Sequence, residues 1–337
     1  MSRGAVRIVL ASVGLVVLAF GALLLGEFPI PPDEVFRALW SGISGDEFGV
    51  PPAVRSAVWL IRVPRIGTSL LVGAALASAG ATFQGVFRNP LVSPNILGVS
   101  TGAGLGAAVA ILLGLPVVLI QGFAFATGIV TVALVYFLAR AVGRAHSSVH
   151  VLVLAGVVTG SLMGAGISLV KFLADPHDEL PAITFWLLGS LSSTTREDLV
   201  AVAPAFLIGL VPLVLLRWRI NVLSLGDEEA RALGVDVSRT RPILIAGATL
   251  MTASAVSVSG TVGWVGLVVP HLARMTVGPD FRRLLPASAI MGAGYLLVVD
   301  TAARTLMDVE FPLGVLTAVL GAPFFLWLLA TSKKGWR

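Results

Sequence analysis

The chain has 337 residues, of which 56% are hydrophobic and only 12% are charged. A soluble domain carries about 25% charged residues, so this composition excludes an ordinary soluble protein and predicts an all-α integral membrane protein. The sequence has no cysteine, which excludes disulfides and thiolate metal sites. Its 37 glycines fit that class, because small residues let helices pack closely in lipid.

Apolar stretches follow one another along the sequence. A spanning helix needs about 20 mostly apolar residues. We expect about ten of them in one transmembrane domain, residues 1–337, at 8–26, 66–86, 96–113, 117–138, 150–171, 199–216, 242–258, 262–275, 284–301 and 312–330. The first is long for the apolar region of a signal peptide and lacks a clean small-x-small cleavage site, so we expect it to be retained. The eighth is short and is interrupted by Pro270.

The segment 27–60 separates the first two stretches and is rich in proline and acidic residues. Within it Val35, Phe36, Leu39 and Trp40 recur at helical spacing. This pattern predicts an interfacial helix lying on the outer surface.

The distribution of basic residues predicts the orientation of the spans. If both termini are cytoplasmic, sixteen of the 23 Lys and Arg residues belong to the inner side and seven to the outer side. Only five of the 18 acidic residues then lie inside. We therefore expect the N and C termini in the cytoplasm, and the net charge of +5 reflects topology, with no nucleic acid as partner.

Three polar features interrupt the early and late spans. Residues 84–100 contain two prolines and two asparagines at the inner face, which favour a turn. That turn is either a gate, with Asn89 polar and Leu91 as the plug, or an ordinary connection. Arg62 and Arg65 lie on the outer side, where they either contact lipid headgroups and acidic loops or bind carboxylates of a partner. Asp300 and Arg304, four residues apart, are expected to face one another.

The longest polar interruption in the second half is 217–241. Asp227, Glu228 and Glu229 stand where a first helical turn would be, and Gly234 where a helix would end. Carboxylates stabilise a helix N-terminus, and glycine accepts the left-handed conformation that ends one. The sequence therefore predicts a short cytoplasmic helix that protrudes from the membrane.

Catalytic and nucleotide-binding motifs are absent from the sequence. The four histidines make no HExxH or other metal spacing, and no GxxxxGK[ST] occurs, so ATP would have to be bound by another chain. A secondary transporter would need ion-coordinating groups at the bilayer midplane, where the predicted spans offer only Asp300 near Arg304. A membrane-embedded enzyme would need clustered His, Asp or Glu.

Several motifs in order resemble the permease subunits of type II ABC importers, which take up ferric siderophores, haem or vitamin B12. The resemblance covers about residues 55 to 332. It rests on RVPR, GAALASAGATFQGVFRNPLVSPNILGVSTGAGLGA, LGDEEARALGVD, SGTVGWVGLVVPHLAR, DTAAR and EFPLGVLTAVLGAPFFLWLL.

The resemblance implies a multi-pass protein of the cytoplasmic (inner) membrane that is not an enzyme. It would pair with a second copy of itself or a related subunit, with two ATPase subunits that bind ATP and magnesium, and with an extracytoplasmic substrate-binding protein. This chain itself would hold no cofactor and no metal.

The resemblance also assigns residues. The ATPase-coupling element matches Leu225, Gly226, Asp227, Glu228, Glu229, Ala230, Arg231, Ala232, Leu233 and Gly234, within the cytoplasmic loop 217–241. The arginines that dock the binding protein match Arg62, Arg65 and Arg304, and the inner gates match Asn89 and Leu91 and, more loosely, Ser147 and Ser148.

The cargo is not fixed by the motifs. The fifth expected span is small and apolar, and Lys171 at its outer end is its one basic residue. We expect a metal chelate, a ferric siderophore or haem, with vitamin B12 (cobalamin) or molybdate as the alternatives.

Overall fold

A computed structural model describes residues 3–26, 28–45, 49–142, 149–306 and 309–331 of the chain. The described residues are helical and contain no strand. The helices are α1 (Arg3–Leu24), α2 (Pro32–Ser44), α3 (Pro52–Ser56), the π-helix η1 (Ala57–Arg62), α4 (Val63–Phe87), the 3₁₀ turn η2 (Pro94–Leu97), α5 (Val99–Leu112), α6 (Val117–Val142), α7 (Val149–Leu173), α8 (Glu179–Leu188), α9 (Arg196–Leu215), α10 (Arg217–Leu223), α11 (Asp227–Ala232), α12 (Val237–Ser259), α13 (Val265–Val277), α14 (Phe281–Ala303) and α15 (Leu313–Thr331).

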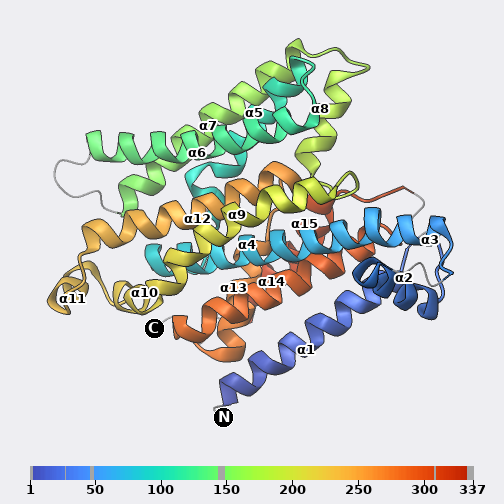
Figure 1. Cartoon of the computed structure of the whole chain (residues 1–337). Helices are drawn as coiled ribbons and strands as arrows, with labels where there is room; N and C mark the ends of the chain where they lie inside the picture. Colours follow the sequence, from blue (N-terminus) through green and yellow to red (C-terminus); the bar gives the residue numbers. More distant parts are fainter. Residues whose placement is uncertain (1–2, 27, 46–48, 143–148, 307–308, 332–337) are drawn as a thin grey trace.

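Helix α4 runs through the middle of the bundle, packed against α9, α12, α13 and α14 (Figure 1). Glycines allow this contact at the level of the backbone. A Cβ on Gly73 would lie 2.2 Å from the carbonyl oxygen of Gly292 in α14, and one on Gly80 would lie 1.9 Å from that of Gly266 in α13. No larger residue fits at these positions without moving a helix, so the glycine-rich composition is explained by close helix packing.

A second group of helices, α5 to α8, lies beside this core (Figure 1). Helices α1, α6, α7 and α9 bury little of their apolar surface within the subunit. Because lipid is as apolar as their side chains, such helices are stable at the rim of a membrane protein without further burial.

Hydrogen bonds between helices define the two ends of the bundle. At the α11 end, Asn221 of α10 donates to the Asp280 carboxylate at the start of α14 over 2.7 Å, and Arg7 of α1 donates to Thr276. At the opposite, α2 end, Arg304 after α14 donates to the last carbonyls of α1. The N-terminal end of α1 therefore lies at the same end of the bundle as α11.

All ten expected spans coincide with a helix, but not all of those helices are long. Among the described residues, seven helices are long and apolar enough to cross a membrane, and four apolar ones are shorter: Val99–Leu112, Glu179–Leu188, Val265–Val277 and Leu313–Trp327. Pro94 and Gly98 delay the start of α5, and positive φ angles at Gly260 and Trp264 delay that of α13. The count of ten spans remains a prediction, and α8 is a helix that the sequence reading did not place.

The segment 27–60 contains the helix expected there, α2, but its buried face differs in detail. Val35 is buried as the spacing predicts, together with Ala38 and Ser41, whereas Phe36 and Trp40 are exposed. Gly42 leaves room for the indole of Trp59, which donates to the carbonyl of Ala38 over 2.8 Å.

Candidate functional sites at the two ends of the bundle

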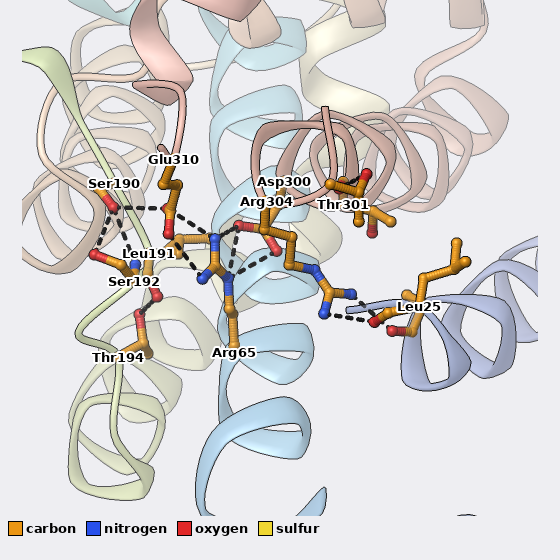
Figure 2. A network of polar contacts seen from close by, with 12 residues as sticks. Leu25, Arg65, Ser190, Leu191, Ser192, Thr194, Asp300, Thr301, Arg304 and Glu310 are labelled. Atoms are coloured by element: carbon orange, nitrogen blue, oxygen red, sulfur yellow. Dashed lines mark hydrogen bonds and ion pairs between the residues drawn. The ribbon is translucent and has the colours of Figure 1, made fainter. Parts of the chain in front are cut away.

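A buried ion cluster lies at the α2 end, centred on Arg65 in the first turn of α4 (Figure 2). Its guanidinium donates to both carboxylate oxygens of Asp300 in α14, with Nη2 2.8 Å and Nε 3.0 Å from Oδ1. The same group donates to Glu310, with Nη2 2.8 Å from Oε1 and Nη1 3.1 Å from Oε2. All three guanidinium nitrogens are therefore used, and the two carboxylates outnumber the one cation.

The cluster extends to the end of α8. Ser190 donates to Oε1 of Glu310 over 3.0 Å, and the Leu313 N–H donates to the Gly189 carbonyl over 2.9 Å (Figure 2). Glu310, just before α15, thus connects the segment after α8 to α4. We name Arg65, Asp300, Glu310 and Ser190 the Arg65 cluster.

The other two arginines expected to dock the binding protein, Arg62 and Arg304, bind the end of α1. Arg62 donates to the carbonyls of Leu23 and Phe28, and Arg304 donates to those of Leu25 at 2.9 Å and Ala22 at 2.7 Å. The last carbonyls of a helix have no partner within it, and cations there also interact favourably with the helix dipole. Arg62 and Arg304 therefore anchor the end of α1.

The expected pairing of Asp300 with Arg304 is not what the structure has. Asp300 is completely buried and its hydrogen-bond partner is Arg65, which lies 235 residues away in sequence. The spacing of four residues on one helix predicted Arg304 as the partner of Asp300. Because α4 packs closely against α14, Arg65 of α4 binds the Asp300 carboxylate instead. The docking role of the three arginines stays a prediction, and their guanidinium groups are engaged inside the subunit.

At the α11 end the predicted capped helix is present as α11. It is followed by Gly234 with φ +80, and the N–H groups of Gly234 and Val235 donate to the carbonyls of Arg231 and Ala230. This pair of bonds is the Schellman motif, in which glycine takes the left-handed position. The acidic first turn and the C-terminal glycine were both found from the sequence.

The residues in and around α11 are buried to very different extents. Ala230 and Val237 are buried within the subunit, whereas Leu225 and Leu233 are 61% and 56% exposed. Glu228, Glu229 and Arg231 are exposed beside those leucines. We name these five exposed residues, one leucine on each side of α11 and three charged residues within it, the α11 patch.

Asp227 is not part of that exposed patch. Its Oδ1 accepts a hydrogen bond from Nη2 of Arg241 over 2.6 Å and lies 3.6 Å from Nη2 of Arg88. The hydrogen bond from Arg241, with the charges of Arg241, Arg88 and Arg231, holds the pKa of Asp227 below its usual range despite partial burial. We name Asp227, Arg88 and Arg241 the Asp227 cluster.

The predicted gate residues lie beside this cluster. Asn89 directly follows Arg88, and its side-chain oxygen accepts the Leu91 N–H over 2.9 Å, which closes a tight turn. Leu91 is exposed at the α11 end. Ser147 and Ser148 lie outside the described residues.

Sequence reasoning missed the roles of Glu310, Ser190 and Arg241. Glu310 opens the motif EFPLG, and nothing in the local sequence indicates that its partner lies 245 residues away. An acidic residue two positions before a proline, at the start of an apolar stretch, is the one signal in the sequence. In the described part of the chain, no three His, Asp or Glu side chains come together as a metal site would require.

The architecture defines a class of protein before any comparison. Over the described residues it is a bundle of helices, seven of them long and apolar enough to cross a membrane, with the short helix α11 at one end, in a chain whose sequence carries no nucleotide-binding motif. A model of the FecCD transport family matches residues 14–331, and the chain belongs to that family, whose members are permease subunits of ABC importers.

Individual relatives support the same assignment. The molybdate import system permease protein MolB of Haemophilus influenzae is 38% identical, with 95% of this chain and 94% of that protein covered. An iron chelatin transport system permease of Helicobacter pylori is 44% identical, with 81% and 82% covered. A metal-chelate type ABC transporter in an inward-facing conformation has a TM-score of 0.86 at 36% identity, over 96% of this chain and 99% of that chain.

Proposed function

We propose that this chain forms the membrane pathway of a metal-chelate importer and that two separate ATPase subunits drive it through α11. The observation that carries the proposal is the α11 patch. Leu225 and Leu233 flank the six-residue helix α11 and are both exposed, and the neighbouring Gly226 and Gly234 both have positive φ. Exposed leucines rimmed by charge at the end of a membrane bundle are typical of a protein contact.

A leucine-to-aspartate change tests this contact. The double variant Leu225→Asp with Leu233→Asp should lose co-purification of the ATPase, because both substitutions place charge in the apolar centre of the patch. Leu306→Asp, an equally exposed leucine at the α2 end, is the matched control and should retain the ATPase. Normal ATPase recovery with the double variant would refute the assignment of α11.

We place the substrate-binding protein at the α2 end. The end of α1 is bound there by Arg62 and Arg304, and the end of α14 is bound by Arg65. We propose that these arginines fix the positions of the helix ends that form the docking surface. Arg304→Gln should free the end of α1 and weaken a pull-down of the binding protein several-fold, and Arg282→Gln at the opposite end should not. Equal recovery of the binding protein by both variants would exclude this role.

A second copy of the chain would complete the pathway. Helix α7 carries exposed apolar side chains along most of its length, among them Leu154, Val158, Leu162 and Phe172, and it has no charged residue before Lys171. We propose that α7 lines the pathway between two copies. An apolar lining suits a bulky chelate, because it offers no fixed charge that would retain the cargo.

The cargo proposal is an iron chelate, meaning a ferric siderophore or haem. The relative named for iron chelatin and the metal-chelate type transporter support it. The relative named for molybdate makes an oxyanion the second candidate. Uptake into proteoliposomes with the cognate binding protein should occur with ferric chelate or haem, and uptake of molybdate or cobalamin alone would overturn the choice.

A further inference from the structure

The turn after α4 holds an arginine where the fold favours glycine. Arg88 has φ +53, its N–H donates to Gly85, and the Asn89 N–H donates to Gln84. This is the same Schellman motif that ends α11, where Gly234 occupies the equivalent position. A side chain in the left-handed conformation is strained, so the motif at Arg88 retains a residue that its backbone disfavours.

The side chain of Arg88 lies toward α11. Its Nη2 is 3.6 Å from Oδ1 of Asp227, and both side chains are partly exposed, at 41% and 29%. The same oxygen accepts the shorter bond from Arg241, whose side chain is only 8% exposed. One carboxylate oxygen is therefore shared between an arginine fixed in α12 and an arginine on the turn after α4.

One hydrogen-bond donor of the Asp227 cluster has no acceptor. Nε of Arg241 is buried and has no hydrogen-bond partner. Buried guanidinium nitrogens are almost always satisfied, so one without a partner identifies an arrangement with bonding capacity left over. Nε of Arg304 at the α2 end is also buried without a hydrogen-bond partner, so the two clusters are distinguished by their carboxylates: one oxygen is shared by two arginines around Asp227, whereas two carboxylates occupy all three guanidinium nitrogens of Arg65.

We propose that Asp227 is a positioning residue that joins α11 to the turn 88–92 and transmits the displacement of α11 to Leu91. This inference rests on the proposed function, in which the ATPase moves α11. Asp227 is the first residue of α11, so it moves with that helix. Arg88 is bonded through its backbone to the last turn of α4 and precedes the Asn89–Leu91 turn, so a pull on its side chain acts directly on that turn.

Replacing Arg88 by glycine separates this role from a structural one. Arg88→Gly relieves the left-handed strain, so the complete transporter should unfold at the natural temperature or higher. The ATPase should co-purify normally, because the α11 patch is unchanged. Cargo moved per ATP hydrolysed in proteoliposomes should fall by about tenfold, within the range of typical coupling between sites. Arg282→Gln, which removes an exposed charge at the same end, is the control.

Each outcome decides the question. Full transport per ATP by Arg88→Gly would overturn the proposal, and so would loss of ATPase co-purification, since Arg88 would then belong to the ATPase contact. If the natural chain itself recovers no ATPase, the proposed function fails, whatever the variant does. Asp227→Asn should give the same loss of transport per ATP with the ATPase retained, and normal coupling in that variant would also contradict the proposal.

Discussion

The two ends of the bundle both contain arginine–aspartate clusters, but the clusters differ in saturation. Around Arg65 at the α2 end, two carboxylates take up all three guanidinium nitrogens, and Asp300 is fully buried. Around Asp227 at the α11 end, one carboxylate oxygen is shared by two arginines, Arg241 at 2.6 Å and Arg88 at 3.6 Å.

This difference in hydrogen bonding indicates that the two clusters have different structural roles. A buried pair with complete hydrogen bonding is costly to break, so the Arg65 cluster fixes the relation of α4, α14 and the segment before α15. A partly exposed carboxylate shared between two cations has alternative arrangements of similar energy. We therefore call the Arg65 cluster the frame, because its arrangement is fixed, and the Asp227 cluster the joint, because its arrangement can change.

The largest effect should come from removing the buried carboxylate of the frame. Asp300→Ala leaves Arg65 in an apolar environment with only Glu310, and breaking such a pair costs about 3–5 kcal/mol. We expect little folded protein by size-exclusion chromatography in detergent. Asp33→Ala, which removes the exposed partner of Arg37, should leave the amount of folded protein unchanged, and equal losses in both variants would refute the contrast.

A smaller effect should follow from Glu310→Gln. Arg65 keeps its bonds to Asp300, so the loss is one charged hydrogen-bond partner, about 1.5–3 kcal/mol. The unfolding temperature should fall measurably while the protein remains folded. A loss as large as that of Asp300→Ala would show that Glu310, and not Asp300, is the main counter-ion.

The joint should tolerate substitution better than the frame. Asp227→Asn removes a partly exposed charge, and we expect a cost below about 1 kcal/mol. Thermal unfolding in detergent would measure this against Glu310→Gln. A loss greater than that of Glu310→Gln would mean that the α11 end is as rigid as the α2 end.

Lowering the pH from 7 to 5 should not change the stability that the ion pairs of Asp227 provide. The pKa of Asp227 in the folded chain is lowered from the model-compound value of 3.8, so its stabilising contribution is complete above that value and is lost only as the pH falls through the lower folded pKa. The difference in unfolding temperature between the natural chain and Asp227→Asn should therefore be the same at pH 7 and pH 5. A difference that disappears by pH 5 would contradict the assigned ion pairs.

Local patterns predicted the local structure well. The acidic turn before Gly234 predicted α11 and its end, and apolar length located a helix in each expected span. Spacing predicted the wrong partner for Asp300 and none for Asp227, because these partners are set by how α4 packs against α14 and how α12 lies beside α11. Contacts between residues 235 positions apart leave no periodic signal in a single sequence, and only the fold reveals them.

The most direct test of the joint is a double-variant cycle on transport. Cargo moved per ATP hydrolysed would be measured for Arg88→Gly, Asp227→Asn and the pair of substitutions in the complete transporter. If the two residues act through one contact, the double variant should be no more than about twofold worse than the worse single variant. Losses that multiply would show that Arg88 and Asp227 act independently and would contradict the account.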